Sequence, residues 1–544
     1  MGSAGRIGLL LGLLWSGMCL ADPPPTPPPS TNPAAILNQQ QQLQQYYQQR
    51  QKKPAAPVNP VIVTPTPGET GVAGLGASFV LRGVRVNHSG FLSTSDITAI
   101  VKPYLNKKVD FTDLQRIVDK INALYSAKGV VTARAILPPE TIKDGVVHIE
   151  LIEGRLGQIK LEGNARTRTS YIDSRINQKP GELVDVAALK QQLTFFNRTN
   201  NVQLKALLQP GASLGLTNIL ILAQEPPRAG LDLFAGNGGV DSTGRNQLGA
   251  VLRYNGLFGI TDRLDAYVTS SRGDTDGYLS YTAPVDEQGG RLGLSYSRNQ
   301  INIINGPYQA LDITGHSWNS ALNFSQPFIA TENWLFSGAA ALSKVHSVTD
   351  AAGVGISSSN INQFSLGFSL ENTTASHIWS TTQTLARLHS DETVAGDNNF
   401  TLYNATLTWY QDLPSPYSIL INSGWQWTPS DNLPSAELFQ AGGIGSVRGY
   451  ELGILSGPRG FYADFELHRQ FRDGFDGYVF LDQAKVFAAY PSTAYISGLG
   501  AGIAWHHWEP FVLSLDLAKP LNTVIPSQDR WRIDFRLTYH WDIK

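Results

Sequence analysis

The segment 442–450, Gly-Gly-Ile-Gly-Ser-Val-Arg-Gly-Tyr, has a composition that in other proteins can bind phosphate. Its four glycines would let backbone N–H groups approach an anion, as in the loops that cradle nucleotides. A phosphate loop, however, joins a strand to a helix and ends in Lys-Ser or Lys-Thr, and neither feature follows here. The spacing therefore argues against a nucleotide site.

Histidines and carboxylates are the other residues with catalytic or metal-binding chemistry. His506 and His507 are consecutive, and neighbouring residues of a strand point to opposite faces, so the two do not share a metal. The acidic residues show no metal spacing and no arrangement that would activate a nucleophile. We therefore expect no catalytic residue, no metal and no cofactor, and we do not expect an enzyme.

The overall composition limits the kind of protein that carries these residues. Asp, Glu, Lys and Arg make up only 16% of the 544 residues, against roughly 25% in a typical soluble protein. The net charge is −2, so no basic field would attract nucleic acid. Beyond the N-terminus, no run reaches the ~18–20 apolar residues of a membrane helix. An unusually uncharged soluble protein or a transmembrane β-barrel remains.

The N-terminus has the features of a secretory signal peptide over residues 1–21. Arg6 precedes an apolar run, and small residues end at Ala21, where the peptidase would cut. Acylation at Cys19 is the minor alternative. Cleavage after Ala21 would remove the only cysteine and with it any disulfide or thiolate chemistry.

Residues 22–53 are rich in Pro and Gln. The Gln-rich part predicts either one helix at about 34–50 or a disordered polar tail. Residues 54–76 form a linker rich in Pro, Thr and Gly, so we expect the helix to be tethered rather than packed in a domain.

The stretch 77–227 contains the order strand-helix-helix-strand-strand twice, with a repeat of ~75 residues. The expected elements are strand 79–86, helix 96–104 capped by Ser95, helix 111–128, strands 130–137 and 146–152, then strand 156–161, helices 169–176 and 186–196, and strands 203–209 and 217–224. The pair resembles two POTRA domains, 77–154 and 155–227. Two generic α+β domains are the alternative. A sheet with an exposed edge can accept an extended, unfolded polypeptide as another strand.

From residue 228 to residue 544 the sequence alternates between apolar and polar residues. In 531–541, aromatic and aliphatic residues alternate with charged and polar ones, as in a strand between lipid and water. A soluble β-sandwich also alternates, but 317 residues divided by sixteen strands fits a barrel with short turns and loops. The sixteen expected strands lie near 229–236, 247–256, 263–271, 277–284, 290–299, 315–324, 333–343, 361–371, 379–390, 399–410, 416–427, 459–468, 476–488, 498–506, 510–518 and 531–541.

The glycine-rich segment lies in the longest connection, between the eleventh and twelfth expected strands. Its Val447-Arg448-Gly449-Tyr450 resembles the VRGY motif of two-partner secretion transporters. The resemblance implies that the loop folds into the barrel and that Arg448 pairs with an Asp on strand thirteen, in an F-x-D-x-G motif. Here the motif is Phe480-Leu481-Asp482-Gln483-Ala484, in which Ala484 replaces Gly and puts close backbone approach at that position in doubt.

An ion pair between Arg448 and Asp482 has a physical purpose. A loop of about 30 residues is mobile unless it is tied, and a sixteen-stranded barrel has an aqueous interior. One guanidinium–carboxylate pair in a partly desolvated lumen can hold the loop tip at a defined depth. The alternative is a solvated loop arginine and an ordinary lumen carboxylate.

The resemblance covers the whole mature chain: a plug-type helix, two POTRA domains and a sixteen-stranded antiparallel barrel. It implies a translocator in the outer membrane of a Gram-negative bacterium, with its POTRA domains in the periplasm. Its expected partners are an unfolded exoprotein (adhesin, hemolysin or toxin), outer-membrane lipid and the barrel-assembly machinery. The alternatives are a factor that inserts outer-membrane proteins and a passive porin-like channel.

Overall fold

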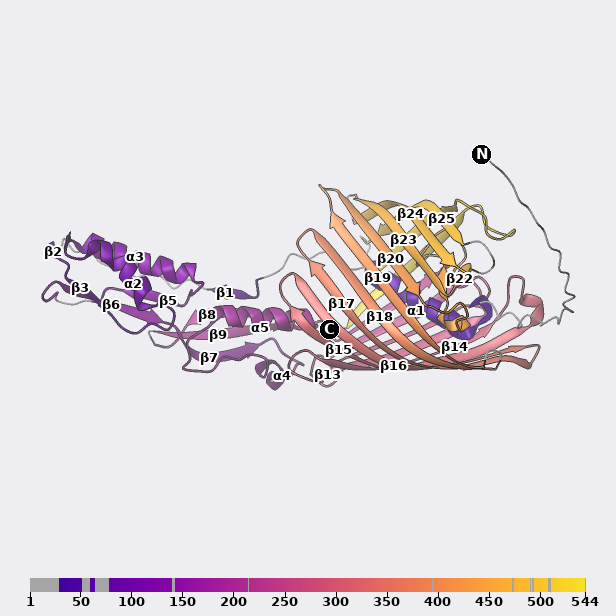
Figure 1. Cartoon of the computed structure of the whole chain (residues 1–544), viewed down its shortest axis with the longest axis horizontal. Coiled ribbons are helices and arrows are strands. Elements are labelled where there is room, and N and C mark those ends of the chain that lie inside the picture. The colour runs from indigo at the N-terminus through magenta and orange to yellow at the C-terminus, as the bar shows by residue number, and fades with distance from the viewer. Residues whose placement is uncertain are drawn as a thin grey trace, which may run out of the picture.

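The computed structural model describes residues 29–50, 59–63, 78–138, 142–213, 215–393, 396–471, 474–489, 491, 494–506 and 510–543. Two small α+β domains follow one another in a row and lead into a barrel of tilted strands (Figure 1). The expected signal peptide, 1–21, lies outside the described residues. None of the described helices is long and apolar enough to cross a membrane.

The first α+β domain consists of a three-stranded sheet, two short strands and two helices. In its sheet, β6 (Val146–Glu153) lies between the parallel β3 (Gly83–Val86) and the antiparallel β5 (Ala133–Ile136). β2 (Phe79–Val80) pairs with β4 (Lys108–Val109). The helices are α2 (Thr94–Val101), which is followed by the 3-10 turn η2 (Lys102–Tyr104), and α3 (Phe111–Ala127). The apolar face of α3 supplies much of the core, as its spacing predicts.

The N-cap of α2 is Ser93, so the expected cap at Ser95 is wrong. Ser93 Oγ accepts the backbone N–H of Asp96 at 3.2 Å, and the Asp96 carboxylate accepts the N–H of Ser93 at 3.0 Å. This reciprocal pairing needs an acid three residues after the cap, and only Ser93 stands at that distance from Asp96. Hydrogen bonds from Lys128 and Ser93 lower the pKa of Asp96 to about 2.

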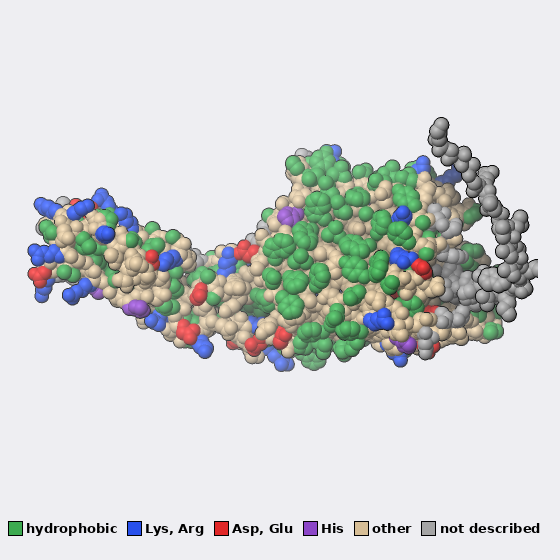
Figure 2. Space-filling model, viewed as in Figure 1, with side chains coloured by type: hydrophobic (Ala, Val, Ile, Leu, Met, Phe, Trp, Pro, Cys, Tyr) green, Lys and Arg blue, Asp and Glu red, His purple; other side chains and the backbone are tan. Residues whose placement is uncertain are grey.

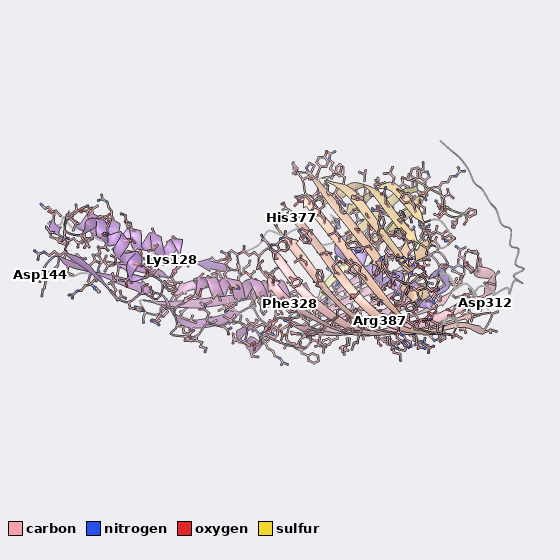
Figure 3. All side chains as sticks on the ribbon, viewed as in Figure 1. Lys128, Asp144, Asp312, Phe328, His377 and Arg387 are labelled. Carbon is pink, nitrogen blue, oxygen red and sulfur yellow. The ribbon has the colours of Figure 1, made fainter. Side chains whose placement is uncertain are left out.

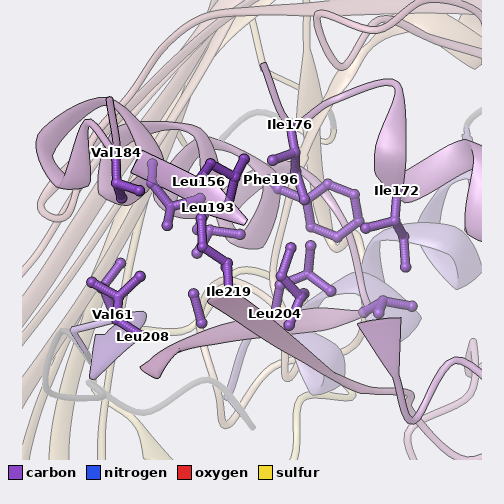
Figure 4. Close-up of a cluster of buried hydrophobic side chains, with 14 of the residues drawn as sticks. Val61, Leu156, Ile172, Ile176, Val184, Leu193, Phe196, Leu204, Leu208 and Ile219 are labelled. Carbon is purple, nitrogen blue, oxygen red and sulfur yellow. The ribbon is translucent and has the colours of Figure 1, made fainter. Parts of the chain in front are cut away.

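The second α+β domain contains β7 (Arg155–Glu162), α4 (Thr169–Asp173), α5 (Val186–Thr199), β8 (Gln203–Pro210) and β9 (Leu216–Gln224). Its core packs Leu193 and Phe196 of α5 against Leu204 and Ile219 of the sheet (Figure 4). The sheet order is β1-β8-β9-β7.

Strand β1 (Val61–Val63) comes from the segment expected to be a linker. It pairs in parallel with residues 206–208 of β8, and Val61 is part of the domain core. The edge of β8 is therefore already occupied by this chain.

Sixteen antiparallel strands form the closed barrel, which confirms the expected fold class. The last strand pairs with the first along eight residue pairs. The strands are β10 (Ala229–Gly236), β11 (Gln247–Asn255), β12 (Arg263–Ser270), β13 (Asp274–Pro284), β14 (Arg291–Asn302), β15 (Ile313–Ala330), β16 (Trp334–Ala351), β17 (Val354–Thr373), β18 (His377–Glu392), β19 (Gly396–Asp412), β20 (Tyr417–Trp427), β23 (Arg459–Gln470), β24 (Phe475–Phe487), β25 (Tyr495–Trp505), β26 (Phe511–Pro520) and β27 (Arg532–Ile543).

Five neighbouring strands, β15 to β19, are longer than expected. They have 16 to 20 residues each, whereas the alternation in the sequence predicts 10 to 12. β15 gains 325–330 at the end near the α+β domains, whereas β16 and β17 gain seven or eight residues each at the remote end, where 357–360 of β17 is Ser-Ser-Ser-Asn. Such residues pair as a ladder beyond the lipid without the apolar alternation that reveals a strand in the sequence.

The barrel surface has the two faces that the alternation predicts. In β27, Ile533 and Phe535 are exposed on the outside, and Arg532, Asp534 and Arg536 are buried on the inside. A broad belt of apolar side chains covers the outside of the barrel (Figure 2). This belt is the surface that faces lipid hydrocarbon.

Helix α1 (Pro33–Arg50) lies inside the barrel, so the expectation that it is merely tethered is wrong (Figure 1). The end that begins at Pro33 is remote from the α+β domains, and Asn299 Nδ2 donates to the Pro33 carbonyl oxygen at 2.9 Å. Ala34, Ile36 and Leu37 are almost fully buried against the barrel interior.

Candidate functional site: an ion-pair network in the barrel lumen

The long connection between β20 and β23, residues 428–458, turns inward instead of extending from the barrel rim. Its two arms pair as β21 (Phe439–Ala441) and β22 (Leu455–Gly457). Gly449 has φ +93°, and a Cβ there would lie 3.0 Å from the backbone N of Pro520 on the wall. This position needs glycine both for its left-handed backbone and for the close approach to β26.

Arg448, at the tip of the loop, is 1% exposed. Its Nε and Nη2 donate to the two carboxylate oxygens of Asp482, each at 2.7 Å. The backbone N–H of Arg448 also donates to Asp482 Oδ2, at 3.0 Å. The structure thus brings together the two residues proposed from the sequence, in the bidentate geometry that favours arginine over lysine.

Phe480 lies two residues before Asp482 on the same inward face of β24. The guanidinium carbon of Arg448 is 3.5 Å from the centre of its ring, which is a cation–π contact. Phe480 therefore covers one face of the Arg448 guanidinium, and Asp482 accepts hydrogen bonds from the edge of that guanidinium.

Val447 and Tyr450 anchor the tip on either side of Arg448. Val447 is fully buried in an apolar cluster with Leu455, Val486 and Ile496. The Tyr450 hydroxyl is 2.9 Å from the carbonyl oxygen of Ser497 and 2.8 Å from Asn522 Oδ1.

The close backbone approach that Ala484 put in doubt occurs one strand away. Ala484 is buried in the same apolar cluster as Val447. Gly498 of β25, which is in register with Asp482, faces the carbonyl oxygen of Arg448, and a Cβ there would collide with it. A glycine is required in this part of the wall, at 498 rather than at 484.

Further ionisable partners of the network were missed in the sequence. Glu466 Oε1 on β23 accepts from Arg448 Nη1 at 2.5 Å, and Asp516 Oδ1 on β26 lies 3.6 Å from the same nitrogen. Arg50, the last residue of α1, donates to Glu466 Oε1 at 2.9 Å. Alternation places Glu466 and Asp516 on inward faces, but it does not give the depth of a side chain or its neighbour across the lumen.

Glu466 is therefore shared between the loop and the helix. Its second oxygen, Oε2, lies 2.8 Å from His468 Nε2. The Arg50 guanidinium also lies 4.7 Å from the centre of the Tyr478 ring, whose hydroxyl donates to Asp516 at 2.7 Å. Because Glu466 is 2% exposed, removal of either arginine leaves buried negative charge with less compensation, which is strongly unfavourable.

A second set of polar contacts joins the second α+β domain to the near end of the barrel. Arg175 donates to the carbonyl oxygen of Asp286 at 2.6 Å, and Arg198 pairs with Glu371 at 3.1 Å. Within the second domain, Glu225, in the segment that leads from β9 to the barrel, accepts from Arg166 Nε at 2.9 Å. Burial raises the pKa of Glu225, but hydrogen bonds from Arg166 and Thr167 outweigh it and hold that pKa below its usual range.

Comparison with known families identifies this architecture. Residues 215–505 match the family described as haemolysin secretion/activation protein ShlB/FhaC/HecB, and residues 79–154 match the ShlB-type POTRA domain. The first match covers more than half of the chain. The chain belongs to this family. It is an outer-membrane transporter of two-partner secretion type with its POTRA domain in the periplasm, and the function expected from the sequence, export of an exoprotein through the barrel, is confirmed.

Individual relatives agree with this assignment. The heme/hemopexin transporter protein HuxB of Haemophilus influenzae (strain 86-028NP) is 24% identical, with 80% of this chain and 82% of HuxB covered. The outer membrane transporter CdiB of Escherichia coli is 26% identical, with 75% and 72% covered. A solved structure of CdiB from Escherichia coli superposes with a TM-score of 0.65 at 20% identity, over 96% of this chain and all of CdiB, and shares its fold.

Proposed function

We propose that this transporter rests with its lumen closed by α1, and that Arg448, Asp482 and Glu466 hold the long loop and the helix in that state. The observation that supports this most is the shared carboxylate of Glu466, which binds Arg448 of the loop and Arg50 of the helix. An exoprotein that passes through the barrel must displace α1, because the helix occupies the interior that the chain would cross.

Capture of the unfolded exoprotein takes place at the edges of the POTRA sheets. Edge strands have unpaired backbone groups that an extended chain can complete. In the first sheet the edges are β3 and β5, and in the second they are β7 and β1. A client strand reaches β8 only by displacing β1, and β1 follows α1 after ten residues of sequence. Capture at β8 would therefore act on the segment that leads to the helix.

The same proposal covers the remaining partners and chemistry. The barrel-assembly machinery inserts the chain, for which β27 presents outward aromatic side chains such as Phe535 and Trp541. The members of the family are transporters, and we assign this chain no catalytic residue and no cofactor.

Replacement of Arg448 by alanine tests the proposal. It should cut export of the cognate exoprotein strongly and raise the conductance of the barrel in planar bilayers, because the loop tip loses its bidentate anchor. The loss of stability should be about 3–5 kcal/mol, the cost of breaking a buried ion pair by removing one partner. Arg448→Lys keeps the charge but not the bidentate geometry, so its export and conductance should lie between those of the unchanged chain and of Arg448→Ala. Unchanged export and conductance in Arg448→Ala would remove the proposed role.

A further inference from the structure

The outer face of the barrel carries a group of basic side chains over β16, β17 and β18. Lys344 and His389 lie in one row of the sheet, because Asn362 between them is in register with both. Arg387 lies one row nearer the periplasm, in register with Phe364. All three basic side chains are exposed on the outside of the barrel.

Directly beneath this row, apolar side chains cover four neighbouring strands. Register joins Leu294, Leu322, Leu342 and Phe364 into one row that ends at Arg387, and the four are 39–61% exposed. A shallow groove on the outer surface is lined by this apolar row together with Lys344, Arg387 and His389. In Figure 2 basic side chains lie at the margin of the apolar belt that is remote from the POTRA domains.

The depth of the basic row follows from the strand geometry. Trp334 and Trp379 pack edge to face, 5.7 Å between ring centres, near the periplasmic end of β16 and β18. Lys344 comes ten residues after Trp334 on β16. Ten residues at ~3.3 Å each, in a strand tilted by about 40°, rise about 25 Å along the membrane normal. This rise equals the usual height of the apolar band, so the row lies at the headgroups of the outer leaflet.

Little on the protein neutralises these charges. Among the described residues, no salt bridge involves Lys344, Arg387 or His389. Within the described part of the chain, Arg387 donates one hydrogen bond, from Nη1 to Thr401 Oγ1 at 2.9 Å. The other four N–H groups of its guanidinium are available to an acceptor. The acidic Asp391 on this face lies beyond the row, opposite Asn360. Figure 3 places Arg387 on the outside of the barrel, between Phe328 at the periplasmic end and Asp312 at the opposite end.

We propose that this groove binds a phosphorylated, multiply acylated lipid of the outer leaflet, the lipid A part of lipopolysaccharide. Lys344, Arg387 and His389 bind the phosphate groups, and the guanidinium of Arg387 can do so bidentately. The acyl chains lie along the apolar row below. The groove thus contacts both the phosphates and the acyl chains of one ligand. A free phosphate would contact only the basic row, and a neutral lipid only the apolar row.

Two other lysines near the extracellular end provide a matched control. Lys485 and Lys519 lie on β24 and β26, on another part of the wall, and their Nζ atoms sit over the rings of Phe487 at 5.0 Å and Trp531 at 5.6 Å. Each is a single cation over an aromatic ring. The pair Lys485→Gln/Lys519→Gln therefore removes the same charge from the same end of the barrel without touching the groove.

The test measures binding of bis-phosphorylated lipid A to the purified, delipidated full chain in detergent, by native mass spectrometry. Lys344→Gln/Arg387→Gln should weaken binding about thirtyfold, from about fivefold per basic residue near a charged lipid, and the control pair should leave binding unchanged. Heat-dependent migration on gels verifies that both variants are folded.

Three results would overturn the proposal. Equal loss in the two double variants would mean that general charge at the barrel rim, and not the groove, attracts the lipid. Equally tight binding of dephosphorylated lipid A would rule out recognition of phosphate. Competition by inorganic phosphate at the same concentration as lipid A would assign the site to free anions instead of a lipid.

Discussion

Two regions of the transporter hold a separate part of the chain against the barrel with arginine–carboxylate pairs, and they differ in burial. In the lumen, Arg448 and Asp482 are 1% and 0% exposed. At the junction of the second POTRA domain, the side chain of Arg198 on α5 is 22% exposed and that of Glu371 on β17 is 27% exposed. The same chemical pairing thus operates in a nearly dry site and in a partly wet one.

The difference determines how each region responds to damage. A buried charge that loses its partner has no water to replace it, so the whole cost of desolvation appears in the folded state. A partly exposed charge is rehydrated and screened by salt, and such pairs contribute about 0–1 kcal/mol. We infer that the lumen network changes state as a unit, whereas the POTRA junction adjusts gradually to solvent conditions.

Crowding the wall behind the loop tip should break the lumen side of this comparison. Gly498→Ala places a methyl group against the carbonyl oxygen of Arg448, so the tip must shift although every charge remains. We expect the free energy of unfolding to fall by about 3 kcal/mol, the upper range for overpacking. The barrel should therefore unfold at a lower temperature on gels. Gly277→Ala on β13, where the nearest atom to the new Cβ would be 3.8 Å away, is the control, and an equal loss there would refute the explanation.

Removing the cation of the helix should have the next largest effect. Arg50→Gln leaves Glu466 paired with Arg448 and His468, so we expect a loss of about 2 kcal/mol, as for a hydrogen bond to a charged group. The released helix should raise the open probability of single channels in planar bilayers. Gln45→Ala, at an exposed position of α1, should leave the channel as it is; a similar rise there would show that any change in the helix opens it.

The smallest effect should occur beside the POTRA junction, at Glu225 in the segment that leads into the barrel, and it should depend on pH. The pKa of Glu225 is lowered in the folded state. Ionised Glu225 therefore stabilises the fold fully above the ordinary glutamate pKa of about 4.3, and this stabilisation is lost as the pH falls through the lowered pKa. Arg166→Gln should lower the stability by about 1 kcal/mol at neutral pH. Because it removes the hydrogen bond that lowers the pKa of Glu225, the acid-induced loss of stability should begin at a higher pH. Limited proteolysis between β9 and β10 across pH 2–6 measures this, and Glu225→Gln, which cannot titrate, should remove the dependence. A pH profile that both variants share with the unchanged chain would contradict it.

The barrel was predictable from the sequence because its rule has a period of two residues. Arg532, Asp534 and Arg536 alternate with apolar residues and fix the faces of β27 without any knowledge of neighbours. The same rule missed the outer part of β17, where the polar run 357–360, Ser-Ser-Ser-Asn, interrupts the alternation. The cap of α2 also escaped prediction by two residues, because Ser93 and Ser95 differ only in their distance from Asp96.

The lumen network was predictable only in part. Arg448 and Asp482 are 34 residues apart, and their pairing was suggested by resemblance to a family motif and not by spacing. Glu466 and Arg50 belong to no local pattern, because they are 416 residues apart in sequence and meet only when α1 enters the barrel. Contacts between an inserted helix and a barrel wall depend on depth, which alternation does not encode.

The central claim is that the loop tip and α1 share one carboxylate, that of Glu466, and therefore act together. Single-channel conductance of Arg50→Gln, Arg448→Ala and the double variant forms a cycle that measures their coupling. We predict that the double variant conducts no more than the more open single variant. Glu466→Gln, which keeps the shape of the side chain and removes the shared charge, should have the same conductance as the double variant. Increments that simply add in the double variant would show that loop and helix are held independently and would contradict the claim.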